Sequence, residues 1–173
     1  MNEAAIGDSR TRVLSECALC VALTVVLSML NVFTMPQGGS INLEMAPILV
    51  FSCRRGVKWG TAAGAMSGVI QIIYGGYVVH PVQAILDYPL AFACLGVSGL
   101  FGRRTIAGMT VACASRLVSH VASGVIFFSA YAPDGQNPLV YSLVYNATIM
   151  IPSTIISIAV ARLLLIKLSG RHG

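Results

Sequence analysis

Five polar or ionisable residues interrupt the long apolar runs of this sequence and are the first candidates for chemistry. They are Glu44, Asp87, Arg116, His120 and Asn146. Such groups are costly inside apolar helices and are therefore interpreted first as functional. A carboxylate surrounded by aromatic rings suits a flat organic cation, because charge pairing is joined by cation–π contacts of about 0.5–2 kcal/mol each. The residue types thus favour a binding site for a small cationic molecule.

Aromatic side chains are placed at the same predicted depth as these polar groups. They are Tyr77, Tyr88, Phe128, Tyr131, Tyr141 and Tyr145. An aromatic belt at the membrane interface is the alternative explanation, above all for Tyr131 and Tyr145. Arg116 and His120 are four residues apart and share a helix face, so Arg116 could position His120 or pair with Asp87. His120 could also simply hydrogen-bond a neighbouring helix.

A catalytic reading of the same residues stays open at this point. His120 and Asp87 could form a dyad in an intramembrane enzyme, although nothing in their spacing specifies a reaction. The sequence contains no clear nucleophile–base pair and no metal-ligand cluster, so we expect no enzyme activity, no cofactor and no metal. A subunit that acts only as a scaffold, without a small ligand, is a further alternative.

Composition places these residues in a membrane protein. The chain has 173 residues, a mean hydropathy of +0.81 and only 10% charged residues, whereas soluble domains carry about a quarter charged residues. The net charge of +5 is spread over short clusters between apolar runs. Such clusters are typical of topology signals at anionic lipid surfaces and exclude a nucleic-acid-binding stripe.

Six helices are predicted to position the candidate residues in one domain, 1–173, after a short polar segment, 1–12. A membrane span needs roughly 20 mostly apolar residues, and the predicted helices are 13–33, 41–53, 57–74, 81–101, 106–131 and 139–167. At a rise of about 1.5 Å per residue, Asp87, His120 and Asn146 all lie in the outer half. The predicted fold is an all-α integral membrane protein.

The distribution of basic residues predicts the orientation of this bundle. Lys and Arg are absent from the expected loops 34–43, 75–80 and 132–138, and they gather at the opposite side: Arg10, Arg12, Arg54, Arg55, Lys58, Arg103, Arg104, Arg162, Lys167 and Arg171. By the positive-inside rule both termini are cytoplasmic. We therefore expect a multi-pass membrane protein, and the family resemblance described below implies the plasma membrane of a prokaryote.

Small residues recur at four-residue spacing on two of the predicted helices. Gly60, Gly64 and Gly68 do so on the third helix, and Ala18 and Ala22 on the first. This spacing lets helices approach closely in lipid. For the glycines we expect packing inside the chain. For the alanines, internal packing and contact with a partner protein are both open.

Several stretches together resemble the thiamine-specific S-components of energy-coupling factor transporters. They are MPQGGSINLEMAP from Met35, Arg54-Arg55-Gly56, YVVHPVQAILDY from Tyr77, RLVSH from Arg116, FFSAYA from Phe127 and YSLVYN from Tyr141. The order and spacing fit over nearly the whole chain. The resemblance implies a six-helix S-component-like bundle with a thiamine site near the outer face. It implies ligand contacts for Tyr77, Asp87, Tyr88, His120, Phe128, Tyr141 and Asn146.

The sequence departs from this family pattern at three points. Asp87 stands where glutamate is frequent, and Phe128 stands where some members have tryptophan. Gly39 and Ser40 stand near a tryptophan that some members carry in the first outer loop. A site for another vitamin, or for a thiamine precursor, therefore remains an alternative.

The resemblance also implies partners. S-components use a transmembrane coupling subunit and two ATP-binding subunits, and they dock through an Ala-x-x-x-Ala face that Ala18 and Ala22 match. The sequence has no Walker A motif, so coupling to ATP would require these partners.

Overall fold

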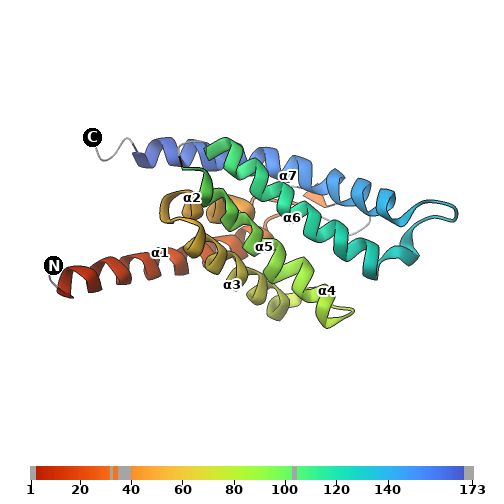
Figure 1. The fold of residues 1–173 in the computed structure, drawn as a ribbon, viewed down its shortest axis with the longest axis horizontal. Helices are drawn as coiled ribbons and strands as arrows, with labels where there is room; N and C mark the ends of the chain where they lie inside the picture. The colour runs from red at the N-terminus through yellow and green to blue at the C-terminus, as the bar shows by residue number, and fades with distance from the viewer. Residues whose placement is uncertain (1–2, 32, 35–39, 103–104, 170–173) are drawn as a thin grey trace.

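The computed structural model describes residues 3–31, 33–34, 40–102 and 105–169. Six helical segments form one elongated bundle (Figure 1): α1 (Glu3–Met29), α2 (Met45–Arg55), α3 (Val57–Gly75), the run from α4 (Pro81–Ile85) through η2 (Leu95–Phe101), α6 (Thr105–Phe127) and α7 (Pro138–Ser169). A short antiparallel ribbon, β1 (Phe33–Thr34) with β2 (Ser40–Ile41), joins α1 to α2, and the 3-10 turn η3 (Ser129–Tyr131) follows α6.

The surface of the bundle is that of a membrane protein. Four helical stretches are long and apolar enough to cross a bilayer: Arg10–Met29, Pro81–Phe101, Thr105–Phe127 and Pro138–Leu168. Large apolar side chains are widely exposed, as Ile73 on α3 and Val118 on α6 illustrate at 80% and 68%. Such side chains need lipid rather than water around them, and the backbone groups are satisfied within helices. The predicted all-α membrane fold is confirmed.

The helix α2 is shorter than a membrane span. Its 11 residues give a length of about 16 Å, and its Ile48 and Leu49 are fully buried. It begins at Met45 and not at the predicted residue 41, because Ser40 and Ile41 pair with β1. Pro47 lies in its first turn, where the missing N–H would have no helical partner. The helix fills the interior of the bundle.

The boundaries of α1 also differ from the prediction of 13–33. The helix continues back through the polar segment to Glu3 and ends at Met29. It stops early because Phe33 and Thr34 pair with Ile41 and Ser40, and aromatic and β-branched residues suit such pairing. The predicted signals at Met35–Gly39, Arg103, Arg104 and Arg171 lie outside the described residues.

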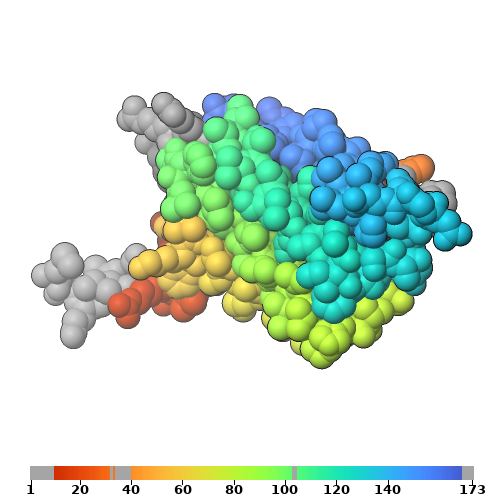
Figure 2. Space-filling view, turned by 45° about the vertical axis from the view of Figure 1, so that its right-hand side comes forward, coloured from red at the N-terminus to blue at the C-terminus, as the bar shows by residue number. Residues whose placement is uncertain are grey.

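The ends of the bundle agree with an even number of passes. The start of α1 and the end of α7 lie at one end of the molecule, whereas α4 and the α6–α7 connection lie at the other (Figure 1). The space-filling view shows α6 and the first half of α7 as one continuous face (Figure 2). Which end faces the cytoplasm remains the prediction made from the basic residues.

The fourth predicted helix, 81–101, is continuous but irregular. A π-helical turn, η1 (Leu86–Leu90), is followed by α5 (Ala91–Cys94) and by the 3-10 segment η2. Pro89 lies within the π turn and has no N–H to donate, so the helix widens around it. The Leu86 carbonyl of the same turn accepts a hydrogen bond of 2.6 Å from Ser119 Oγ on α6. The irregular turn is thus the one that contains Asp87 and Tyr88.

Candidate ligand-binding site

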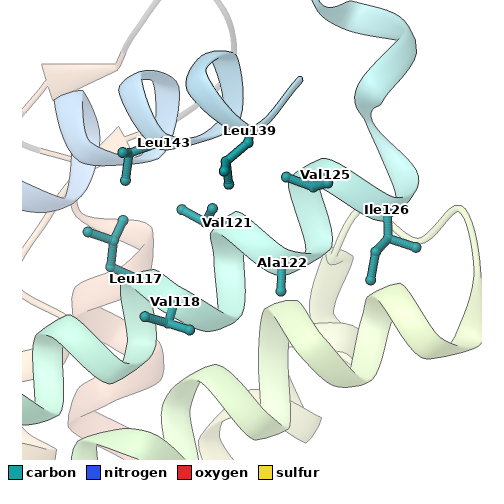
Figure 3. Close-up of a pocket in the computed structure, with 8 residues that line it drawn as sticks. All are labelled: Leu117, Val118, Val121, Ala122, Val125, Ile126, Leu139 and Leu143. Carbon is teal, nitrogen blue, oxygen red and sulfur yellow. The ribbon is translucent and has the colours of Figure 1, made fainter. Parts of the chain in front are cut away.

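Two hollows of different chemistry occur among the described residues. The larger, about 420 Å³, is a groove between α6 and α7 (Figure 3), and its lining is entirely apolar: Leu117, Val118, Val121, Ala122, Val125, Ile126, Leu139 and Leu143. The smaller, about 150 Å³, has a polar lining: Ser40, Asn42, Glu44, Met45, Arg116, His120, Asn146, Ile149, Met150 and Ser153. Of these two, the second has the lining that suits a polar or charged ligand. Four of the five polar candidates line it, Glu44, Arg116, His120 and Asn146, and the fifth, Asp87, contacts His120.

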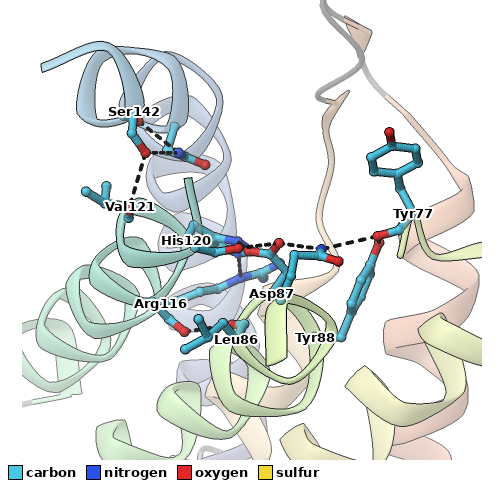
Figure 4. Close-up of polar contacts among 12 residues, drawn as sticks. Tyr77, Leu86, Asp87, Tyr88, Arg116, His120, Val121 and Ser142 are labelled. Carbon is cyan, nitrogen blue, oxygen red and sulfur yellow. Dashed lines mark hydrogen bonds and ion pairs between the residues drawn. The ribbon is translucent and has the colours of Figure 1, made fainter. Parts of the chain in front are cut away.

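Asp87 is the centre of the polar network. Its Oδ1 lies 3.1 Å from His120 Nδ1, and its Oδ2 accepts hydrogen bonds from Ser123 Oγ at 2.8 Å and Gln83 Nε2 at 2.7 Å. Its side chain is 17% exposed. Figure 4 shows Asp87 between His120 of α6 and Tyr77 of the loop before α4. The π turn therefore aims this carboxylate at α6, as the predicted depths of Asp87 and His120 indicated.

Gln83 connects Asp87 to the loop 76–80. Its amide donates to the Tyr77 carbonyl at 3.2 Å and accepts from the Val79 N–H at 3.1 Å. Tyr88 Oη donates to the same Tyr77 carbonyl at 3.4 Å (Figure 4). The orientation of Asp87 and the path of this loop are consequently coupled.

Arg116 does not pair with Asp87, which corrects one of the two roles considered for it. Its Nη2 donates to Glu44 Oε1 at 2.6 Å, and its Nε lies 3.3 Å from His120 Nε2. Glu44 Oε2 also accepts from Gln71 Nε2 at 3.1 Å. The guanidinium lies 4.0 Å from the centre of the Phe92 ring. The Arg116 and Glu44 side chains are only 8% and 13% exposed, as expected for a buried pair that neutralises itself.

The charges of the site do not balance. Glu44 and Arg116 cancel, and the only ion-pair partner of Asp87 among the described residues is His120. When the His120 imidazole is neutral, the Asp87 carboxylate contributes one uncompensated negative charge. A buried carboxylate in this state is stabilised by any cation that reaches it.

Aromatic side chains lie beside this network in two groups. Tyr77 and Phe128 have ring centres 6.3 Å apart, and Phe128 and Tyr131 6.1 Å. A hydrogen bond with the Tyr131 side chain raises the pKa of the Tyr77 phenol, which ties the loop before α4 to η3. Tyr141 stacks on Tyr145 along α7, with ring centres 6.2 Å apart. The two groups are at distances suited to ring contacts.

Asn146 reaches the polar cavity from α7. Its Nδ2 donates to the Ser142 carbonyl at 2.8 Å, and Ser142 Oγ donates to the Val121 carbonyl of α6 at 3.1 Å. A side chain at Gly124 would collide with Ser142, so α6 and α7 cross closely here. Asn146 is thereby held in the same cavity as Arg116 and His120.

Two hydrogen-bond partners of Asp87 were not predicted from the sequence. Gln83 lies one helical turn before Asp87, and Ser123 lies three residues after His120. Those spacings put each of them on the same helix face as a recognised candidate. Polar residues at such positions could have been included on that ground.

Ala18 and Ala22 lie on the outer face of α1, and both are exposed. They do not pack inside this chain. The interior face of the same helix is formed by Val13, Cys17, Val21 and Thr24.

The fold and the candidate site define an α-helical, multi-pass membrane protein with a small cavity that has a polar and charged lining. The chain belongs to the thiamine transporter protein family (Thia_YuaJ), whose model matches residues 14–171. It is 38% identical to the thiamine transporter ThiT of Bacillus subtilis (strain 168), in an alignment that covers 87% of this chain and 88% of that protein.

Two further similar proteins point to the same family. The thiamine transporter ThiT of Lacticaseibacillus paracasei is 32% identical in an alignment that covers 88% of this chain and 86% of that protein. A solved structure of ThiT from Listeria monocytogenes superposes with a TM-score of 0.84 at 29% identity, covering 94% of this chain and 97% of that one. The chain is accordingly a multi-pass plasma-membrane protein of a transporter family, not an enzyme.

Proposed function

We propose that this chain is the high-affinity thiamine-binding subunit of an energy-coupling factor importer and captures thiamine from the outer side. The observation that supports this most is the uncompensated charge of Asp87 beside the polar cavity. Thiamine has one permanent positive charge on its thiazolium ring and an amino group on its pyrimidine ring. A single buried carboxylate beside ring faces matches both features.

Asp87 has room for one more partner. An ionised carboxylate offers about four acceptor positions, and Gln83, His120 and Ser123 use three of them. In the proposed complex the remaining position accepts from a cationic or amino group of the ligand. Tyr88 and Asn146 complete the polar contacts, and His120 borders the ligand with its ring while both of its nitrogens stay bonded to Asp87 and Arg116. The aromatic faces come from Tyr77, Phe128 and Tyr141.

The import step is proposed to need other subunits. The alanine face of α1 is exposed and apolar, since Leu14, Leu19 and Leu23 are also exposed on this helix. We propose that Ala18 and Ala22 dock a transmembrane coupling subunit, which two ATP-binding subunits drive. Small side chains favour such close helix contacts in lipid.

Calorimetric titration of the purified protein with thiamine tests the binding step. Saturable binding is expected without ATP and without partner subunits. The free pyrimidine precursor, riboflavin and biotin serve as comparison ligands. Heat with one of these but none with thiamine would reject thiamine as the ligand and favour another vitamin or a precursor.

The variant Asp87→Asn tests the role of the carboxylate. Removing one partner of a desolvated charge pair typically costs about 2–5 kcal/mol, so thiamine affinity should fall by well over tenfold while the protein still folds. Asp134→Asn is the matched control, because Asp134 is exposed in the connection before α7. Near-parental affinity of Asp87→Asn would mean that the carboxylate has a structural role only.

A further inference from the structure

We propose that Arg116 is a positioning residue that keeps His120 neutral, with its single proton on Nδ1, and that Glu44 holds Arg116 in place for this task. The inference rests on the proposed function, because it explains how the site retains a negative charge for a cationic ligand. Arg116 acts through His120 and not by touching the ligand.

The tautomer follows from the donors and acceptors around the imidazole. A guanidinium can only donate hydrogen bonds, and Arg116 Nε lies 3.3 Å from His120 Nε2. Nε2 must therefore present its lone pair and cannot bear a proton. The proton of the neutral ring is then on Nδ1, which lies 3.1 Å from Asp87 Oδ1 and donates to it. In a doubly protonated ring, the Nε2–H group would face the Arg116 N–H, and two donors cannot form a hydrogen bond with each other.

Arg116 is fixed by direct contacts with Glu44 and Phe92, and Glu44 is itself supported by Gln71. Glu44, at the start of α2, pairs with its Nη2, and Gln71 of α3 in turn holds Glu44. Phe92 of α5 lies beneath the guanidinium at 4.0 Å. An arginine remains charged at any physiological pH, so this donor does not switch off.

The protonation state of His120 decides the charge of the site. The charged or titratable groups around it are Arg116 on α6, Asp87 and Tyr88 on η1, and Glu44 before α2. An imidazolium would neutralise Asp87 and remove the attraction for a cation. By occupying Nε2, Arg116 opposes that protonation.

The first test observes the tautomer directly in the full-length, ligand-free protein. Nitrogen NMR of protein labelled with ¹⁵N-histidine distinguishes N–H from bare ring nitrogens. The sequence has three histidines, and the variant His120→Gln identifies the signal of interest. We expect Nδ1 to be protonated and Nε2 bare near neutral pH. A proton on Nε2, or on both nitrogens, would overturn the proposal.

This measurement separates the inference from the proposed function, because no thiamine is added. A protein that shows the expected tautomer but fails to bind thiamine would reject the proposed ligand and support the proposed role of Arg116.

The second test removes the donor with Arg116→Met and follows thiamine affinity from about pH 8 to about pH 5.5, the range in which an imidazole titrates. The parent should change little. The variant should lose about tenfold more affinity at the acidic end, the size expected for one hydrogen bond to a charged group. Arg162→Met is the control, since Arg162 bonds only Thr105 among the described residues.

The double variant Glu44→Gln/Arg116→Met covers the case in which the single variant does not fold, because it leaves no unpaired Glu44 charge. It should show the same acid-sensitive binding. Parental tautomer and parental pH profile in whichever variant folds would overturn the proposal.

Discussion

The helices α1 and α3 both have small residues at four-residue spacing, but the structure uses the two faces in opposite ways. Gly60, Gly64 and Gly68 are buried, whereas Ala18 and Ala22 are exposed. A Cβ atom on Gly64 would collide with the Phe92 carbonyl, and one on Gly68 would come within 2.6 Å of the Pro89 Cα. The spacing indicates close approach of a neighbour, and burial reveals whether that neighbour belongs to the same chain.

The glycine face of α3 also determines where the site lies. Gly68 faces the backbone of Tyr88 and Pro89 in the π turn. Close approach there holds the turn that presents Asp87 to α6. The alanine face of α1 has no such neighbour among the described residues, and it lies on the side of the helix opposite the buried Val13, Cys17 and Val21.

Gly64→Val should have the largest effect of the substitutions that probe this contrast. The new side chain would press on the α5 backbone, which cannot move as a flexible side chain could, and overpacking costs about 1–3 kcal/mol or more. Thiamine binding and the folded protein should be lost together, as followed by gel filtration and thermal unfolding. Ala62→Val, at an exposed position of the same helix, should behave like the parent. A folded Gly64→Val protein with parental stability would contradict the packing described here.

Ala18→Trp or Ala22→Trp should abolish thiamine uptake by cells and leave the thiamine affinity of the purified subunit nearly unchanged. A bulky side chain blocks close approach of a docking helix, and it would lie on the exposed face of α1, which contributes none of the described residues that line the polar cavity. Ile155→Trp is the control, at a 63% exposed position of α7. Unimpaired uptake would show that the alanine face is not a docking surface. Loss of binding together with uptake would indicate that the substitution disturbs the bundle itself.

Glu16→Gln should have the smallest effect. Glu16 of α1 binds Arg55 through two hydrogen bonds of 2.5 and 2.7 Å, and the two side chains are 24% and 25% exposed. Partly exposed ion pairs contribute about 0–1 kcal/mol, so thermal stability should fall slightly and thiamine affinity should not change. A large loss of stability would mean that this pair, and not the buried face of α1, attaches the helix to the bundle.

Much of the candidate site could be predicted from the chain because polar residues are rare in it. Asp87, His120 and Asn146 stand out against apolar helices, and counting residues along each helix places them at similar depth. The pairing of charges could not be predicted in the same way. The sequence suggested Asp87 as an ion-pair partner of Arg116, and only the tertiary structure shows that Glu44, directly before α2, takes this place.

The amino-acid sequence alone was enough to predict the membrane class, the helices and the spacing of small and polar residues along each helix. These properties depend on composition and on local backbone geometry. The irregular turn at Pro89 and the early end of α1 required more, because they depend on contacts with Ser119 and with β2. The burial of the glycine face and the exposure of the alanine face required the whole bundle. A helix fixes which residues share a face, but which face meets which neighbour is settled only when all the helices pack together.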